Sequence, residues 1–206
     1  MTSNQVLLVE GTDDQHVIWN LLKHHDFPEV FRVDQKGGID RLMSTFPVQI
    51  KASNMRSLGV VVDADLDLPA RWASLKAKVE SLGYADCPDV PPCGGLILNH
   101  RELPRFGAWL MPDNLLPGML EDFVAYLVPD GDLLWTHSSD AISGIPEGLR
   151  EFSQDHLCKA KIHTWLAWKA DPGTPLGLAI SKKYLRADAP AVASFLAWLR
   201  RLFDIE

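Results

Sequence analysis

Three aspartates that alternate along the chain are the clearest candidates for chemistry in this sequence. They are Asp63, Asp65 and Asp67, and they follow directly on the apolar run 58–62. Consecutive β-branched residues of this kind are typical of a strand buried on both faces. If the backbone stays extended past the strand, its two-residue period directs Asp63 and Asp65 to the same side. Carboxylates this close repel one another, whereas a hard cation such as Mg²⁺ or Mn²⁺ takes oxygen ligands of this type.

A second acid, Glu10, ends the first apolar run of the chain, residues 5–9. In open α/β sheets, ligands bind at the carboxyl ends of the strands. Glu10 and Asp63 both lie at such ends and meet if their strands are neighbours. The sequence therefore predicts a Mg²⁺ or Mn²⁺ site, with one or two ions, that includes Glu10, Asp63 and Asp65.

Other sites also use the D-x-D pattern. A calcium-binding EF-hand loop starting at Asp63 requires Gly and Glu where this chain has Leu68 and Ser74, so that interpretation fails. A haloacid-dehalogenase-like phosphatase normally has Thr or Val at the position of Asp67, and it leaves Glu10 without a role. That phosphatase and a plain solvated loop stay open as alternatives. Because Pro69 is suited to start a helix, Asp67 is expected to cap that helix or to support the site.

The surrounding elements alternate between strands and helices, which predicts βαβ units, a parallel sheet and an α/β fold. A capping box formed by Thr12 and Gln15 marks the first helix, and a pair of helices interrupted at Pro47 is expected over 39–53. The predicted strands are 5–11, 30–38, 57–65, 94–98 and 105–112, and the other predicted helices are 12–25, 69–83, 118–128, 156–169 and 189–203.

Composition limits the class of protein. The chain has 206 residues and a formal charge of −7, which argues against a broad nucleic-acid-binding surface, although residues 156–206 are net basic. Three cysteines without a C-x-x-C pair indicate neither a disulfide framework nor a zinc ribbon. No run approaches the ~18 apolar residues of a membrane span, and no signal-peptide pattern is present. A single cytoplasmic domain, 1–206, with no membrane partner is expected.

Two segments carry a family resemblance. "LLVEGTDDQHVI", followed about fifty residues later by "VVVDADLD", resembles the Toprim domain of topoisomerases, primases and overcoming-lysogenization-defect (OLD) nucleases. The family has a Glu after its first strand, here Glu10, and a D-x-D after its third, here Asp63 and Asp65. Asp14 matches an acid of the OLD branch. The resemblance implies a Toprim-like (Rossmann-like) parallel sheet flanked by helices, with a core over about 5–127 and a helical C-terminal extension over about 128–206.

The resemblance continues downstream. "WLMPDNLLPGMLEDF" is similar to a segment of short stand-alone Toprim proteins, which implies that Glu121 is a further metal-facing acid, supported by Asp113 or Asp122. Acids are also favoured in the first turn of any helix, and that explanation stays open for Asp14, Glu121 and Asp122.

OLD-type nucleases also use a late lysine near the scissile phosphate. By this resemblance Lys161 is the preferred catalytic lysine. The other candidates for phosphate contact are Lys159, Lys182 and Lys183, of which the last two are also typical of solvated charges.

The function implied is metal-dependent phosphoryl transfer, in the form of a Toprim-type endonuclease acting on DNA or RNA. Glu10 would be a metal ligand or the general acid/base. The alternative is a non-catalytic module that binds nucleic acid or a nucleotide with Mg²⁺. The chain has no G-x-x-x-x-G-K-[ST] phosphate loop, in contrast to full-length OLD nucleases, so a separate ATPase is a further candidate partner.

Overall fold

The computed structural model describes residues 4–52 and 54–206, so residues 1–3 and residue 53, the expected end of the 39–53 helix pair, lie outside the described residues. The strands are β1 (Gln5–Val9), β2 (Arg32–Gln35), β3 (Ser57–Asp63), β4 (Leu96–Leu98) and β5 (Arg105–Met111). The helices are α1 (Thr12–His24), α2 (Ile39–Ile50), α3 (Leu68–Ser81), α4 (Leu120–Ala125), α5 (Leu133–Ser143), α6 (Leu157–Ala167), α7 (Leu176–Ser181) and α8 (Pro190–Phe203), with short 3-10 turns η1 (Glu147–Leu149) and η2 (Gln154–His156).

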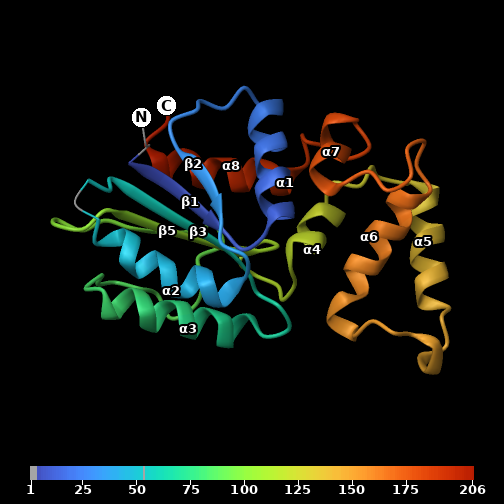
Figure 1. Cartoon of the computed structure of the whole chain (residues 1–206), viewed down its shortest axis with the longest axis horizontal. Helices are drawn as coiled ribbons and strands as arrows, with labels where there is room; N and C mark the ends of the chain where they lie inside the picture. Colours follow the sequence, from blue (N-terminus) through green and yellow to red (C-terminus); the bar gives the residue numbers. More distant parts are fainter. Residues whose placement is uncertain (1–3, 53) are drawn as a thin grey trace.

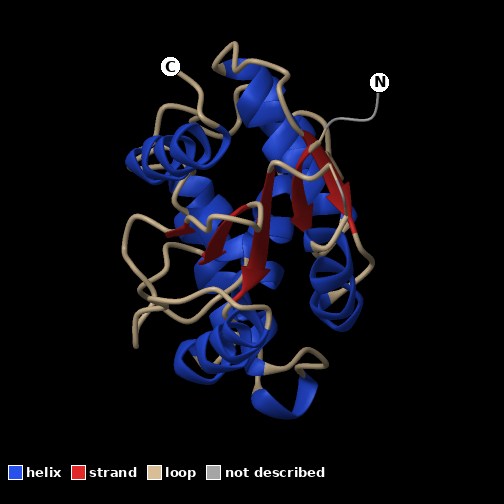
Figure 2. Ribbon diagram, turned by 90° about the vertical axis from the view of Figure 1, so that its left-hand side faces the viewer, coloured by secondary structure: helices blue, strands red, loops and turns tan. Residues whose placement is uncertain are grey.

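The five strands form one sheet in the order β2-β1-β3-β5-β4. All neighbours are parallel except β4, which runs antiparallel to β5. Helices α2 and α3 cover one face, and α1 and α8 cover the other (Figures 1 and 2). The predicted α/β class is therefore confirmed. The order also places β1 beside β3, as the predicted meeting of Glu10 and Asp63 requires.

The last helix returns to the sheet. The indole N–H of Trp198 in α8 donates a hydrogen bond to the backbone carbonyl of Leu96 in β4 (2.9 Å). Leu202 lies so close to β3 that a Cβ added to Gly59 would be 2.6 Å from its Cδ2. The segment expected as a C-terminal extension thus includes a helix, α8, that helps to cover one face of the sheet. The single-domain count itself stays a prediction.

Helices α4 to α7 form a helical lobe beside the carboxyl ends of the strands (Figure 1). Most of its buried apolar residues, Trp165 and Leu166 among them, belong to the same apolar cluster as β1, α1 and α8. The sequence pattern did not predict α5 or α7, because α5 buries few of its apolar residues and α7 is only six residues long. No helix among the described residues is both long and apolar enough to span a bilayer.

The predicted interruption at Pro47 is wrong. Residues Ile39–Ile50 form one helix that runs through Pro47. A proline has no N–H to donate to the carbonyl four residues earlier, here that of Met43. The ammonium group of Lys78 in α3 donates to that carbonyl instead (3.1 Å), so a contact from another helix satisfies it.

Packing between α1 and α7 depends on a missing side chain. A Cβ at the buried Gly177 would lie 2.7 Å from the backbone carbonyl carbon and oxygen of His16. We expect Gly177→Ala to lower the melting temperature by roughly 3–10 °C, because rigid backbone cannot yield and overpacking costs about 1–3 kcal/mol. Gly148→Ala is the matched control, since its Cβ would meet nothing within 4 Å. Thermal unfolding followed by circular dichroism checks this, and equal melting temperatures for the two variants would contradict it.

Candidate active site

Glu10 and Asp63 lie together at the carboxyl edge of the sheet. Their strands are adjacent and parallel, with Leu8 paired to Val60. The backbone N–H of Asp63 donates to Oε1 of Glu10 (2.8 Å). The structure thus brings together the two acids that the sequence predicted to share a site.

Two further predicted acids face the same place. Asp14, in the first turn of α1, is buried and accepts a hydrogen bond from the backbone N–H of Gly11 (3.0 Å). Its neighbour Asp13 is exposed. Glu121, in α4, is also buried. The backbone N–H next to it, that of Leu120, donates to Oδ1 of Asp63 (2.9 Å).

This buried negative charge has a clear electrostatic effect. Burial, followed by the repulsion of Asp14, Glu10 and Glu121, raises the pKa of Asp63 to about 9. Burial and then the repulsion of Glu10 raise the pKa of Asp14 to about 7. Burial also raises the pKa of Glu10, although the N–H of Asp63 and the charge of Arg71 partly oppose that rise. Perturbed acids of this kind are typical of catalytic and metal-binding sites.

Asp65 lies at the outer edge of the acids. The backbone does not stay extended past Asp63: the strand ends there, and Asp65 adopts a left-handed conformation with φ of 53°. Its N–H donates to the carbonyl of Gly118 (2.9 Å), and its own carbonyl accepts from the Gly118 N–H (2.7 Å). The Asp65 carboxylate pairs with the guanidinium of Arg71. Its negative charge still contributes to the raised pKa values of Glu10 and Asp63.

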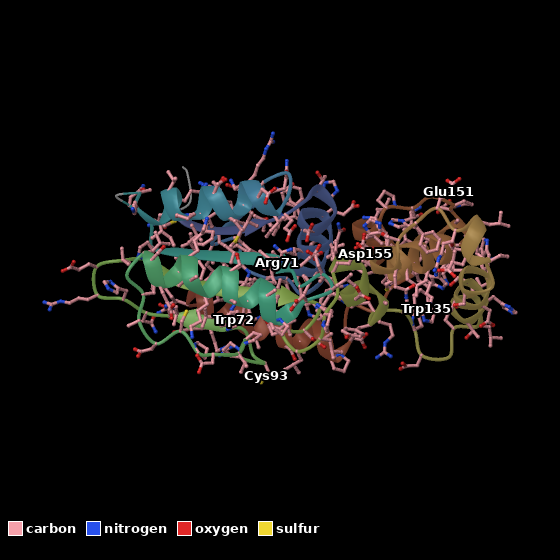
Figure 3. All side chains as sticks on the ribbon, turned by 90° about the horizontal axis from the view of Figure 1, so that it is seen from below. Arg71, Trp72, Cys93, Trp135, Glu151 and Asp155 are labelled. Atoms are coloured by element: carbon pink, nitrogen blue, oxygen red, sulfur yellow. The ribbon has the colours of Figure 1, made fainter. Side chains whose placement is uncertain are left out.

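Arg71 is a site residue that the sequence analysis missed. It lies in the first turn of α3, pairs with Asp65 and lowers the pKa of Glu10. Arg71 and Asp155 line one cleft of about 520 Å³ at the junction between the sheet and the helical lobe (Figure 3). The signal in the sequence that could have indicated Arg71 is its position in the helix that begins directly after the D-x-D. In the structure, its backbone N–H donates to the Asp67 carbonyl (3.0 Å).

The three aspartates that the sequence suggested as support for the site, Asp67, Asp113 and Asp122, accept hydrogen bonds from backbone N–H groups close to them in the chain. Asp67 caps α3 by accepting from the N–H of Ala70 (2.9 Å), which confirms its predicted capping role. Asp122 accepts from the N–H of Met119 (2.8 Å) at the start of α4. Asp113 accepts from two consecutive N–H groups of its own loop, both at 2.9 Å.

The predicted lysines fall into separate places. Lys159 pairs with Oε1 of Glu121 at 2.8 Å. Lys161, two residues later in α6 and so on another side of the helix, lines a cleft that Asp65 also lines, and has no ion-pair partner in the part of the chain that the structure describes. Lys182 pairs with Asp171 (2.6 Å), and Lys183 is exposed. Lys182 and Lys183 therefore have the surroundings of solvated charges.

The donor chemistry of the cluster fits a hard divalent cation, because every candidate ligand is a carboxylate oxygen. Within residues 4–52 and 54–206, however, no three His, Cys, Asp or Glu side chains are placed so that they could hold a metal ion as they stand. The carboxylates point instead to backbone N–H groups, to Arg71 or to Lys159. Metal binding therefore requires rotation of some of these side chains.

One protein family matches almost the whole chain. The family described as protein of unknown function (DUF3226) matches residues 4–204. The chain belongs to the DUF3226 family. No curated protein matches the DUF3226 chain.

Solved structures resemble the DUF3226 chain in fold. The C-terminal region of the Burkholderia pseudomallei OLD protein is 14% identical with a TM-score of 0.52, and the match covers 98% of this chain and 100% of that chain. The C-terminal region of the Xanthomonas campestris pv. campestris OLD protein, phased with mercury, is 15% identical with a TM-score of 0.47, covering 98% of this chain and 97% of that one. The Burkholderia structure supports the α/β fold of the DUF3226 chain.

The raised pKa of Asp63 predicts a pH-dependent stability in EDTA. The folded DUF3226 chain keeps the Asp63 proton up to about pH 9, whereas the unfolded chain loses it near the ordinary value of 3.8. This contribution to stability is therefore complete below about pH 4 and is lost as the pH rises towards 9. Asp63→Asn keeps the acceptor for the Leu120 N–H but carries no charge. We expect it to melt about 5 °C or more above the parent at pH 8, with a smaller difference at pH 5.

Thermal unfolding in EDTA at both pH values checks this, with the exposed Asp140→Asn as the control. A melting temperature for Asp63→Asn at or below that of the parent at pH 8 would show that Asp63 does not lower the stability of the folded chain at that pH.

The ion pair between Lys159 and Glu121 gives a separate prediction. The Glu121 side chain is only 5% exposed, so its charge has little access to water. Lys159→Met should lower the melting temperature by roughly 3–10 °C, because a buried charged group without its partner costs about 1–3 kcal/mol. Lys182→Met is the matched control, since its partner Asp171 is 64% exposed. The prediction fails if calorimetry gives the two variants the same loss of stability.

Proposed function

We propose that this DUF3226 protein catalyses metal-dependent phosphoryl transfer, in the form of phosphodiester cleavage in DNA or RNA. The observation that carries the proposal is the clustering of the half-buried Glu10 and Asp63 with the buried Asp14 at the carboxyl edge of the sheet, with pKa values raised by partial or full burial and mutual repulsion. A divalent cation relieves this repulsion and takes oxygen ligands. The Toprim resemblance of the same residues supports this reading, as does the fold shared with an OLD C-terminal region.

In this proposal, Asp14 and Asp63 hold Mg²⁺ or Mn²⁺, with Asp65 and Glu121 as further ligands when released from Arg71 and Lys159. A bound ion of this type polarises the phosphate and lowers the pKa of water. Glu10 acts as a ligand or moves a proton as general acid/base, for which its raised pKa is suited. Lys161, from α6, lines the same cleft as Asp65, in the part that is farther from Asp65, and contacts a phosphate of the bound strand there.

A non-catalytic module that binds nucleic acid or a nucleotide is the second candidate. The observation in its favour is that two acids are already neutralised by cations of the chain: Asp65 by Arg71, and Glu121 by Lys159. A site arranged in this way can hold a phosphate with a cation and still lack the charge balance for cleavage.

Cleavage and metal binding can be tested together. The purified protein is incubated with circular plasmid, single-stranded DNA and RNA in Mn²⁺, Mg²⁺ or EDTA, and products are resolved on denaturing gels. We expect cleavage that requires the cation and falls at least about 100-fold in Asp63→Asn plus Asp65→Asn, because the ligands of the ion are removed. We also expect 5 mM Mn²⁺ to raise the melting temperature of the parent but not that of the double variant.

Asp113→Asn is the control for cleavage, because the partners of the Asp113 side chain within the described residues are its own loop and Tyr126. Cation-dependent binding of oligonucleotides without cleavage would favour the binding module. Cleavage that survives in the double variant would reject the assignment of the metal site.

A further inference from the structure

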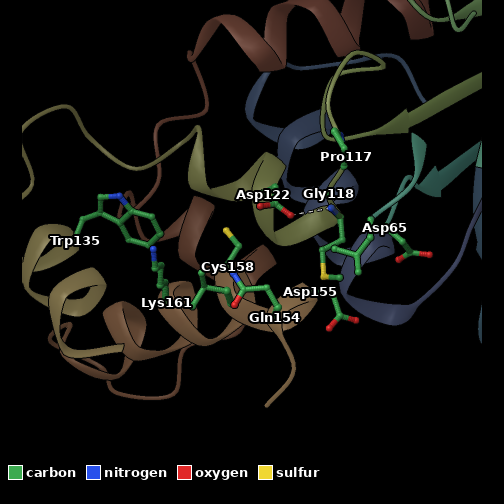
Figure 4. A pocket seen from close by; sticks show the side chains of 12 residues that line it. Asp65, Pro117, Gly118, Asp122, Trp135, Gln154, Asp155, Cys158 and Lys161 are labelled. Atoms are coloured by element: carbon green, nitrogen blue, oxygen red, sulfur yellow. Dashed lines mark hydrogen bonds between the residues drawn. The ribbon is translucent and has the colours of Figure 1, made fainter. Parts of the chain in front are cut away.

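A cleft of about 350 Å³ runs from the acids into the helical lobe (Figure 4). Asp65 and Gly118 lie at one end, beside the carboxyl edge of the sheet. Trp135 of α5 and Lys161 of α6 lie at the other end, and the side chain of Lys161 extends towards the Trp135 ring (Figure 4). The cleft therefore links the candidate metal centre to an aromatic ring and a lysine.

The aromatic end of the cleft is held in place. The backbone N–H of Trp135 donates to the side chain of Asp132, which caps α5 (2.9 Å), and Asp132 also pairs with Lys169 (2.8 Å). The rings of Trp135 and Trp165 meet edge to face at 6.3 Å between centroids. Trp135 is thus a fixed surface that is only partly covered, rather than a core residue.

The volume of the cleft limits its occupant. It lies at the lower end of the roughly 300–1,000 Å³ of small-ligand pockets. This is space for one base with its sugar and phosphate but not for a base pair. A base can stack on Trp135, as bases do on aromatic side chains of proteins that bind single strands. Lys161, which has no ion-pair partner among the described residues, can meet the phosphate.

The charge of the cleft adds a condition. Asp65, Asp122 and Asp155 line it together with Lys161, so its carboxylates outnumber its lysine. A phosphate enters such a cleft favourably only together with a divalent cation. At the mouth, Leu66 is 67% exposed, and exposed apolar side chains of this kind are used to separate stacked bases.

We propose that the cleft between Asp65 and Trp135 binds one unpaired nucleotide of the substrate, with the base on the Trp135 ring and the phosphate at Lys161. The substrate strand is then single-stranded or unpaired next to the acids, and duplex without unpaired bases is a poor ligand. The part of this inference that concerns cleavage next to the bound nucleotide rests on the proposed function. The part that concerns binding of the nucleotide in the cleft does not depend on cleavage.

The test measures binding of a fluorescein-labelled single-stranded pentanucleotide and of a blunt hairpin duplex by fluorescence anisotropy, in Ca²⁺ and in EDTA. We expect the single strand to bind more tightly than the hairpin and to require the cation. Trp135→Leu should raise its Kd at least about five-fold through loss of stacking. Trp135→Phe, which keeps an aromatic face, should stay within about two-fold.

Lys161→Met should also raise the Kd of the single strand at least about five-fold in Ca²⁺, because it removes the phosphate contact. The matched controls are Trp168→Leu and Lys51→Met, which alter an exposed tryptophan and an exposed lysine outside the cleft. We expect both controls to bind as the parent does. If Trp135→Leu fails to fold, Trp135→Phe and Lys161→Met decide the question.

The inference is overturned if folded Trp135→Leu binds the single strand as tightly as the parent, if Trp168→Leu weakens binding equally, or if the hairpin binds more tightly. Binding that is sensitive to Trp135 without cleavage in Mn²⁺ rejects the proposed cleavage and leaves the cleft assignment in place. Cleavage that is unchanged in Trp135→Leu and in Lys161→Met supports the proposed cleavage and rejects the cleft assignment.

Discussion

Acids that are half-buried or buried side by side at the end of a parallel sheet cost free energy when they are charged, and many local contacts of the structure reduce that cost. Backbone N–H groups meet the acids one by one: that of Asp63 faces Glu10, that of Leu120 faces Asp63, and that of Gly11 faces Asp14. These contacts stabilise the charged forms, yet burial still raises the pKa values of all three acids. Backbone dipoles alone therefore leave negative charge uncompensated, which is the state of a site prepared for a cation or a proton.

The topology is what makes this concentration of charge unavoidable. Because β1 and β3 are parallel neighbours, the residues that follow them emerge at the same edge. The helices that begin at this edge, α1 and α4, contribute Asp14 and Glu121 from their first turns. Helix α8, on the same face of the sheet as α1, packs closely over β3 at Gly59, where the absence of a Cβ leaves room for the Leu202 side chain. The hydrophobic core thereby fixes the strands whose ends carry the charge.

The sequence was sufficient where the determinants are local, and insufficient where they are distant. Glu10 and Asp63 could be placed because each directly follows an apolar strand and the alternation of elements implies a parallel sheet. The turn at Asp65 could not, because its left-handed backbone is fixed by hydrogen bonds to Gly118, more than fifty residues later. The interruption predicted at Pro47 was wrong for the same reason, because the backbone carbonyl of Met43 accepts a hydrogen bond from Lys78 in another helix.

Two cations of the chain stand where a metal ion would compete with them. Arg71 in α3 pairs with Asp65, and Lys159 in α6 pairs with Glu121. The ammonium group of Lys159 and a bound metal ion would both take the negative charge of Glu121, so a cation near Glu121 would weaken this ion pair by charge repulsion. Because Lys159 belongs to the helical lobe and Arg71 to the layer over the sheet, release of both pairs would change contacts in both parts of the fold. The charge balance at the edge of the sheet is thereby coupled to the way the helical lobe rests against it.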